Sequence, residues 1–475
     1  MLPTAAFVTG LLLAAAPASA QPDPLGPMPP GAEQPAAPET SDDPSEVSTT
    51  PSIADSFPDP DPGRIRASLG ERGITYSSTY IGETLGNVSG GIKQSRTYQG
   101  RLDMQIDMDF EKLAGLRGLS FHANAYQIHG RGLSGCCLGN LLVTSGIEAQ
   151  ASTRLYELWV EQKLWGDRLS LRVGQLAADT EFFVSRYATL FVNGTFGWPA
   201  FAAANLPAGG PAYPFAAPGA RLKVEPAEGV ALLAAVFNGD PAGPGADPQR
   251  GNPSGTNFRT SDPAFVLAEV SYAYNQGREA ASLPGAVKLG GYHHFGRFED
   301  PRVDASGLSL NDPNGSGTPR RLRGSRGMYV VLDQLVHREA GTRDQGLGVF
   351  LRAAGSPSGG SLVDIYADAG VTYKGLFAGR VNDTLGLGFA YAHISGPARG
   401  FDRDVNSFGP TAWPVRSSEA VVELSYQAEV VPGFTVQPTF QYVVRPGGHA
   451  ANPRDPDGRA IRDAAVLGVR ATVRY

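Results

Sequence analysis

Apolar and polar residues alternate along many segments of this chain, and this alternation limits the possible folds more than any other feature. From Leu102 to Phe110, five apolar residues alternate with four polar ones. A strand places alternate side chains on one face, whereas a helix would scatter these apolar residues around its circumference. The pattern recurs from Phe434 to Tyr442 and from Ala420 to Ala428. The sequence therefore predicts an all-β fold whose strands have two different faces.

Segments of this kind recur along most of the chain. They predict about sixteen strands, and an even number is typical of single-chain bacterial barrels. Besides the three segments above, strands are expected to start near Ile74, Gly118, Thr153, Arg168, Gly219, Val230, Ala264, Ala286, Arg326, Gly346, Leu362, Asp383 and Asp463.

The expected connections differ in length on the two sides of the strands. Connections after even-numbered strands are short, as at residues 165–168, 225–229 and 431–433. Connections after odd-numbered strands are long, at residues 82–100, 129–152, 176–218, 238–263 and 296–325. A soluble sandwich has no reason to segregate loops in this way. The pattern predicts a transmembrane antiparallel β-barrel with long extracellular loops and short periplasmic turns.

The N-terminal segment divides into two parts ahead of the barrel. Residues 1–20 are expected to be a signal peptide for Sec-dependent export, with an apolar centre and the cleavage site Ala18-Ser19-Ala20. No Lys or Arg precedes the apolar centre, so either the start codon is misassigned or the signal is unusual. Residues 21–63 are rich in proline and lack basic residues, so we expect a disordered periplasmic leader. The barrel domain is then residues 64–475.

The last strand carries a separate signal. Leu467, Val469, Ala471, Val473 and Tyr475 form one apolar face that ends in an aromatic C-terminal residue. This arrangement resembles the signal by which barrel-assembly machinery receives outer-membrane barrels, and it places Tyr475 as the contact. The alternative is an ordinary terminal strand of a soluble sheet. Together with the signal peptide and the loop asymmetry, the strand favours the outer membrane of a Gram-negative cell, with lipid around the wall.

A closed ring of sixteen strands leaves an aqueous channel, because in lipid every backbone polar group must be paired internally. The expected inner face carries charges of both signs, including Asp103, Arg172 and Arg470. Mixed charge suits neutral polar solutes better than an ion filter. The net charge of -6 argues against a nucleic-acid partner. No catalytic or nucleotide-binding fingerprint is present, so neither an enzyme nor a cofactor is expected.

Several strings of residues resemble one known family, the carbohydrate-selective porins of the OprB type. They are residues 85–91 (LGNVSGG), 127–132 (QIHGRG), 155–162 (LYELWVEQ), 173–182 (VGQLAADTEF), 196–199 (FGWP) and 238–241 (NGDP). The resemblance runs from about Arg72 to Tyr475. It implies a sixteen-stranded outer-membrane barrel that passes monosaccharides such as glucose, without fixing which sugar.

The loop after the fifth strand, residues 176–218, is the best candidate for a constriction, because the third external loop of general porins folds into the barrel. Within it, residues 179–188 are expected to form a short helix. Aromatic rings can stack on sugar C–H faces, and charged groups can bind hydroxyls. Packing of the loop aromatics against the wall is an equally good alternative. The hypothesis places Glu181, Arg186 and Tyr187 in the constriction, facing Arg154, Glu157, Trp159 and Glu161.

Three alternatives stay open at this stage: a barrel enzyme such as a lipase or protease, a secretion pore, and a porin for another solute. A homotrimer is possible, since a lipid face and a subunit contact look alike in sequence. Cys136 and Cys137 are adjacent and would form a strained ring, so a structural disulfide is not expected. His293 and His294 should point to opposite faces of one strand and cannot bind one metal together.

Overall fold

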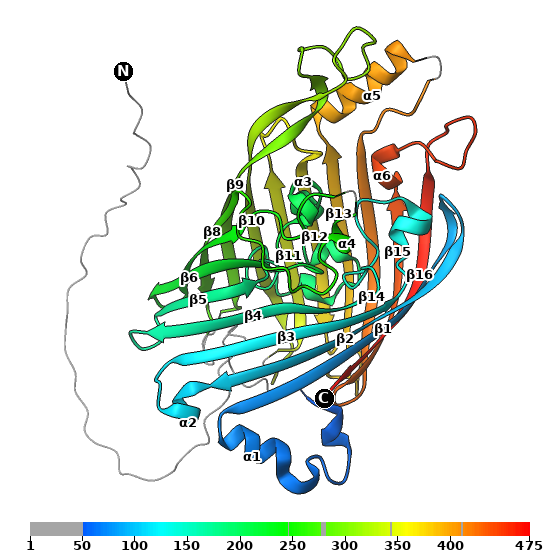
Figure 1. Ribbon diagram of the computed structural model, residues 1–475. Helices are drawn as coiled ribbons and strands as arrows, with labels where there is room; N and C mark the ends of the chain where they lie inside the picture. Colours follow the sequence, from blue (N-terminus) through cyan, green and yellow to red (C-terminus); the bar gives the residue numbers. More distant parts are fainter. Residues whose placement is uncertain (1–50, 246, 277–281, 343, 410–411) are drawn as a thin grey trace, which may run out of the picture. The chain divides into compact units, whose positions relative to one another are not determined.

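The computed structural model describes residues 51–475, except 246, 277–281, 343, 410 and 411. In this part of the chain, sixteen antiparallel strands each pair with the next, and β1 pairs with β16 to close a barrel (Figure 1). The strands are β1 Ile74–Gly91, β2 Ser95–Asp109, β3 Leu119–Gly130, β4 Ser152–Leu164, β5 Leu169–Leu176, β6 Ala217–Ala227, β7 Val230–Asn238, β8 Ala264–Tyr274, β9 Gly285–Asp304, β10 Pro319–Arg338, β11 Gly346–Gly355, β12 Val363–Lys374, β13 Thr384–Ile394, β14 Ser418–Val431, β15 Phe434–Val444 and β16 Arg462–Arg474.

Short helices lie before β1 and in the connections between strands. The α-helices are α1 Ile65–Glu71, α2 Phe110–Ala114, α3 Ala200–Asn205, α4 Pro248–Gly251, α5 Gly396–Phe408 and α6 Pro446–His449. Among the described residues, no helix is both long and apolar enough to cross a membrane.

The alternation of side chains predicted the strands well, because each strand buries one face and exposes the other. Large apolar side chains such as Leu289, Leu387 and Leu467 point outward and are 55%, 49% and 52% exposed. Polar side chains on the opposite faces, such as Glu423 and Gln441, are buried inside the ring. An apolar outer face and a polar inner face are what a barrel in lipid requires.

The long connections differ in two places from those expected. The expected loop at residues 82–100 is wrong, because β1 and β2 continue to Gly91 and from Ser95. The Asn87 side chain closes the turn by donating to the carbonyl oxygens of Gly90 and Lys93, at 3.0 and 2.9 Å. The expected link at 296–325 is also shorter, since β9 and β10 extend to Asp304 and from Pro319. Backbone pairing continues beyond the apolar belt. Strands there are not in lipid, so their residues need not alternate between apolar and polar, and the sequence does not reveal the strand ends.

Two further expectations concern the leader and the cysteines. Residues 51–63 of the expected leader are described, and they begin with a short structured turn: Ser52 caps a 3-10 helix, Ile53–Ser56, and Ala54 is buried. The rest of the leader and the signal peptide lie outside the described residues. The expectation of no disulfide is wrong, because Cys136 and Cys137 are bonded to each other. They lie in a π-helical turn, Ser134–Leu138, whose Cys137 carbonyl accepts hydrogen bonds from the Ile92 and Lys93 amides.

Candidate functional site

The loop between β5 and β6, residues 177–216, lies inside the barrel; we call it the inner loop. Figure 1 shows its helix α3 within the ring of strands. The loop makes hydrogen bonds to inward side chains of β8, β10, β11, β12, β14 and β15. A single loop can touch so many strands only from within the ring. The expected inward fold of this loop is therefore confirmed.

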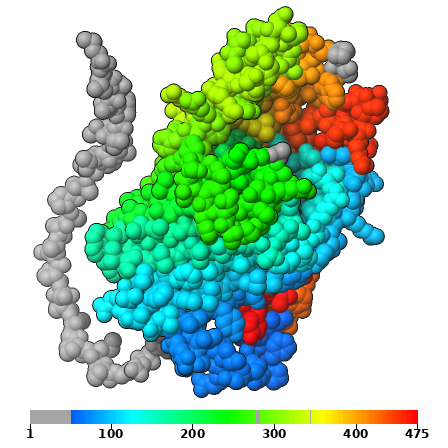
Figure 2. All heavy atoms as spheres, viewed as in Figure 1, coloured from blue at the N-terminus to red at the C-terminus, as the bar shows by residue number. Residues whose placement is uncertain are grey.

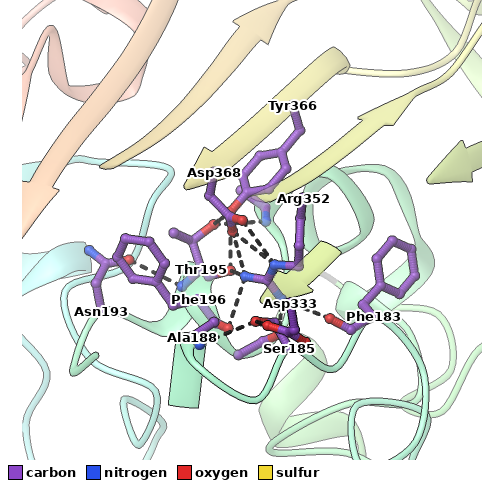
Figure 3. A network of polar contacts seen from close by, with 12 residues as sticks. Phe183, Ser185, Ala188, Asn193, Thr195, Phe196, Asp333, Arg352, Tyr366 and Asp368 are labelled. Carbon is purple, nitrogen blue, oxygen red and sulfur yellow. Dashed lines mark hydrogen bonds and ion pairs between the residues drawn. The ribbon is translucent and has the colours of Figure 1, made fainter. Parts of the chain in front are cut away.

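Arg352 on β11 is the central anchor of the inner loop (Figure 3). Its side chain is 2% exposed, and the guanidinium forms an ion pair with Asp368 on β12. It also donates to four backbone carbonyls of the loop: Phe183 at 2.9 Å, Thr195 at 3.1 Å, and Phe196 and Gly197 at 2.9 and 3.2 Å. A planar guanidinium can serve several acceptors in fixed directions, so this one side chain sets the path of two loop segments.

Three other wall side chains hold the backbone of the loop. Asp333 on β10 accepts from the Ser185 hydroxyl at 2.6 Å and the Arg186 amide at 3.1 Å. Glu423 on β14 accepts from the amides of Val192 and Asn193 at 2.7 and 2.8 Å. Gln437 on β15 donates to the Leu190 carbonyl at 2.7 Å. Buried charges are costly unless they are hydrogen-bonded, and these contacts satisfy them.

The loop aromatics pack against the wall. Phe182, Phe183, Phe191, Phe196 and Phe201 are each at most 5% exposed. The Phe183 ring stacks on Tyr329 of β10 with centroids 3.6 Å apart. The alternative interpretation of these phenylalanines, as packing residues, is therefore correct. Tyr187, Trp198 and Tyr213 of this loop are partly exposed.

The helix expected at residues 179–188 is wrong, since only the 3-10 turn Ala188–Leu190 forms there. The acidic side chains do not cap a helix but bind elsewhere: Asp179 accepts from the Tyr156 hydroxyl at 2.8 Å and from the Tyr213 amide at 2.9 Å. Burial raises the pKa of Asp179, and these two hydrogen bonds oppose the rise.

Glu181 joins a group of charged side chains on the wall opposite Arg352. We call Glu161, Arg172, Glu181, Arg221 and Trp159 the Arg172 cluster. Arg221 lies 2.9 Å from Glu161 and 2.8 Å from Glu181, and Arg172 lies 3.4 Å from both carboxylates. The Arg172 guanidinium stacks on the Trp159 ring, 3.7 Å from its centroid. The cluster binds the start of the inner loop to β4, β5 and β6.

The structure brings together only some of the residues proposed for the constriction. Glu161, Trp159 and Glu181 meet in the Arg172 cluster, and Glu157 lies beside it, accepting from the Ala177 amide at 3.0 Å. Arg154 binds the Asn252 carbonyl at 2.6 Å in the β7–β8 loop, and its guanidinium also stacks on Phe215 of the inner loop, 4.8 Å from the ring centroid. The wall positions therefore serve two different loops.

Arg186 and Tyr187 lie farther along the inner loop, next to Asp333. The Arg186 side chain is exposed and stacks on the Tyr187 ring, 5.9 Å from its centroid. Arg186 is thus an accessible cation of this loop, whereas Glu181 is held in ion pairs.

Sequence reasoning did not select Arg221, Arg352 or Asp368 as site residues. Arg221 shares a face of β6 with Lys223, so strand alternation could have placed it inside. The pairing of Arg352 with Asp368 on neighbouring strands also follows from the register, in which the two residues stand opposite each other. Nothing in the sequence indicates that Arg352 binds loop carbonyls.

A second polar stretch of wall continues from the Arg172 cluster toward β1. His122 on β3 stacks on Trp159 and lies 2.7 Å from Asp107 on β2. Asp103 accepts from Asn124 at 2.7 Å, and Arg470 on β16 pairs with Glu83. Asp107 retains 35% exposure of its side chain. This wall, from β16 through β1 to β4, is polar and carries both signs of charge.

The model of one protein family, carbohydrate-selective porins of the OprB family, matches residues 93–475. The chain belongs to this family. This porin is 27% identical over 407 residues to Porin B of Pseudomonas aeruginosa, covering 81% of this chain and 86% of that one. It is also 21% identical over 440 residues to a putative porin, QuiX, of Acinetobacter baylyi, covering 87% and 92% of the two chains.

The fold agrees with solved structures. The high-pH structure of Pseudomonas putida OprB superposes with a TM-score of 0.74 at 22% identity, covering 87% of this chain and 97% of that one. Its family membership makes this porin a carbohydrate-selective channel of the outer membrane and not an enzyme.

The described part of the chain offers no metal site. No group of three or more His, Cys, Asp or Glu side chains suited to a metal occurs among the described residues. His294 points inward and is buried, whereas His293 lines a groove on the outer face, as expected for neighbours on a strand.

Proposed function

We propose that this porin passes monosaccharides such as glucose by diffusion between the inner loop and the polar wall from β16 to β4. The observation that carries the proposal is the anchoring of the inner loop on β8 to β15, which occupies that side of the channel. The opposite wall keeps polar side chains of both charges. Neutral, hydroxyl-rich solutes suit such a wall better than ions do.

The exposed groups along this path can bind sugar hydroxyls. Asp107 offers carboxylate oxygens, and Arg186 offers guanidinium donors from the loop side. Tyr187 and Trp198 are partly exposed aromatic side chains of the loop and could stack on sugar C–H faces. Arg186 and Tyr187 therefore remain in the proposed constriction, with Glu181, Glu157, Trp159 and Glu161 as the positioning wall. Arg154 is better explained as a contact between the β7–β8 loop and Phe215 of the inner loop.

Orientation and assembly follow from the same reading. We place the long connections outside the cell and the C-terminus on the periplasmic side. Tyr475 continues the pairing of β16 with β1, since its amide and carbonyl bond to Ser78 at 2.8 and 2.9 Å. An aromatic residue at this junction supports recognition by the barrel-assembly machinery.

Liposome swelling tests the proposal. Liposomes containing the mature protein should swell fastest with glucose, more slowly with a disaccharide, and least with an anion of similar size. Arg186→Ala should change glucose flux by about twofold or more while small-solute leakage stays constant. Arg168→Ala, an exposed arginine in the β4–β5 turn, is the matched control. Equal flux for glucose and the anion would favour a porin for other solutes.

A further inference from the structure

A groove of about 680 Å³ lies on the outer face of the barrel across β8 to β11. Small residues form its floor, among them Ala268, Gly291 and Gly355, and Val266 and Met328 form its walls. Met328 is 66% exposed. Large apolar residues such as Leu289, which is 55% exposed, cover the outer face on the side of the groove away from the β9–β10 hairpin, so the groove adjoins the apolar belt.

Basic side chains gather at the end of the groove nearest the projecting β9–β10 hairpin. Arg326 and His293 line the groove and stand opposite each other in the register. Arg323 and Arg297 form the opposed pair farther along the hairpin. Directly opposite residues of two paired strands point to the same face, so each pair shares a face. Figures 1 and 2 show this hairpin rising beyond the rest of the ring, next to α5.

A break in β10 places both pairs on the outer face. Arg323 and Arg326 are three residues apart, so in a regular strand they would point to opposite faces. Gly324 lies between them with φ of 73°, a left-handed conformation that glycine adopts without strain, and the register shifts at this point. Arg297 and His293 are four residues apart on β9 and share its outer face with Phe295, which is 61% exposed.

The three arginines form no ion pair within the described part of the chain, since the nearby Glu299 pairs with Arg321. Neighbouring arginines of the hairpin are paired: Arg321 lies 3.3 Å from Glu299, and Arg320 lies 2.6 Å from Asp300. The side chains of Arg297, Arg323 and Arg326 are exposed and form no hydrogen bond or ion pair with any described residue. Like charges directly opposite each other on paired strands are destabilising. An anion placed between them would remove this repulsion.

We propose that this surface binds a phosphorylated lipid of the outer leaflet, with its phosphate on Arg297, Arg323 and Arg326 and an acyl chain in the groove. Guanidinium groups bind phosphate through paired hydrogen bonds, and basic pockets beside apolar belts bind lipid headgroups. The continuity of the groove with the basic end favours a molecule with both parts over a soluble anion. The inference rests on the proposed orientation, with the long loops outside.

Lipid binding to the purified full-length porin in detergent tests this inference. The probe is lipid A, a diglucosamine with two phosphates and several acyl chains, titrated and followed by native mass spectrometry. The affinity for lipid A should fall about 10-fold or more in the triple variant Arg297→Gln, Arg323→Gln, Arg326→Gln. Gly355→Leu should weaken binding by about threefold, because an added side chain there meets only a backbone oxygen at 3.8 Å and fills the groove.

The matched control removes three exposed arginines from the same end of the barrel but from other strands and loops: Arg131→Gln, Arg454→Gln, Arg462→Gln. It should bind lipid A as the parent does. Equal binding by the groove-side triple variant, or of lipid A without phosphates, would overturn the proposal. Equally tight binding of the phosphorylated diglucosamine without acyl chains would also overturn it. Glucose flux through the same variants should be unchanged. Lipid binding and glucose flux are therefore measured independently, and failure of one proposal can be distinguished from failure of the other.

Discussion

The two sides of the channel interior bind the inner loop in different ways. On β10 to β15, wall side chains bind the backbone of the loop, as Arg352 and Glu423 do. On β4 to β6, the wall binds a loop side chain, Glu181, through arginines. Backbone contacts fix the path of a loop regardless of its sequence, whereas the polar wall from β16 to β4 keeps Asp107 partly exposed, where a solute can meet it. The comparison suggests that one side sets the width of the channel and the other sets its selectivity.

The largest expected effect comes from breaking the backbone-binding side. Arg352→Met leaves Asp368 buried without its cation and leaves loop carbonyls without a donor. The free energy of unfolding should fall by about 3–5 kcal/mol, because an unpaired buried charge is strongly destabilising. Denaturant unfolding in detergent measures this loss, and single-channel recordings should show larger and noisier conductance. The double variant Arg352→Met, Asp368→Leu should recover part of the stability; a single variant as stable as the parent would contradict the anchoring role.

A milder change on the same side should loosen only one segment. Glu423→Gln keeps the shape of the side chain but weakens the acceptor for the Val192 and Asn193 amides. We expect a loss of about 1–2 kcal/mol in the free energy of unfolding, since hydrogen bonds to charged groups are stronger than neutral ones. Hydrogen exchange at these two amides should accelerate. Glu228→Gln, in an exposed turn, should change neither quantity.

On the polar wall from β16 to β4, the same type of substitution should change selectivity rather than stability. Asp107 is partly exposed and pairs with His122 at 2.7 Å. Asp107→Asn should alter the free energy of unfolding by less than about 1 kcal/mol, as exposed pairs contribute little. Removal of a negative charge should raise the flux of an anionic sugar relative to glucose by about twofold. A large loss of stability with constant selectivity would reverse the assignment of the two sides.

The smallest effect is expected at α5, which belongs to neither side of the channel interior. Arg302 donates to Asp404 at 2.8 and 3.0 Å, and this hydrogen bonding lowers the pKa of the Asp404 carboxyl. Because the folded pKa is below the unfolded one, the contact stabilises α5 at neutral pH and is lost as pH falls through the folded pKa. Protection factors of α5 amides should therefore fall at low pH. Asp404→Asn should remove this pH dependence of α5 protection. If the variant keeps the same pH dependence as the parent, the Arg302–Asp404 contact is not its cause.

The sequence predicted the wall much better than the interior. Strand positions follow from alternation, because lipid outside and polar groups inside demand two different faces. The inward course of the inner loop followed only from its place after the fifth strand. Its local structure could not be predicted: Asp179 and Glu181 suggested a helix start, but both bind partners that are distant in sequence, and Phe183 has φ of 64°. The ends of β1 and β2 were missed because pairing beyond the apolar belt requires no apolar face.

The most direct test of the account is the size limit of the channel, measured by liposome swelling with glucose and a series of longer glucose oligomers. The parent should pass glucose and exclude the longer oligomers, while folded Arg352→Met should admit longer ones, because the inner loop is no longer held to β11 and β12. An identical size limit in the two proteins would contradict the claim that this loop sets the width of the channel.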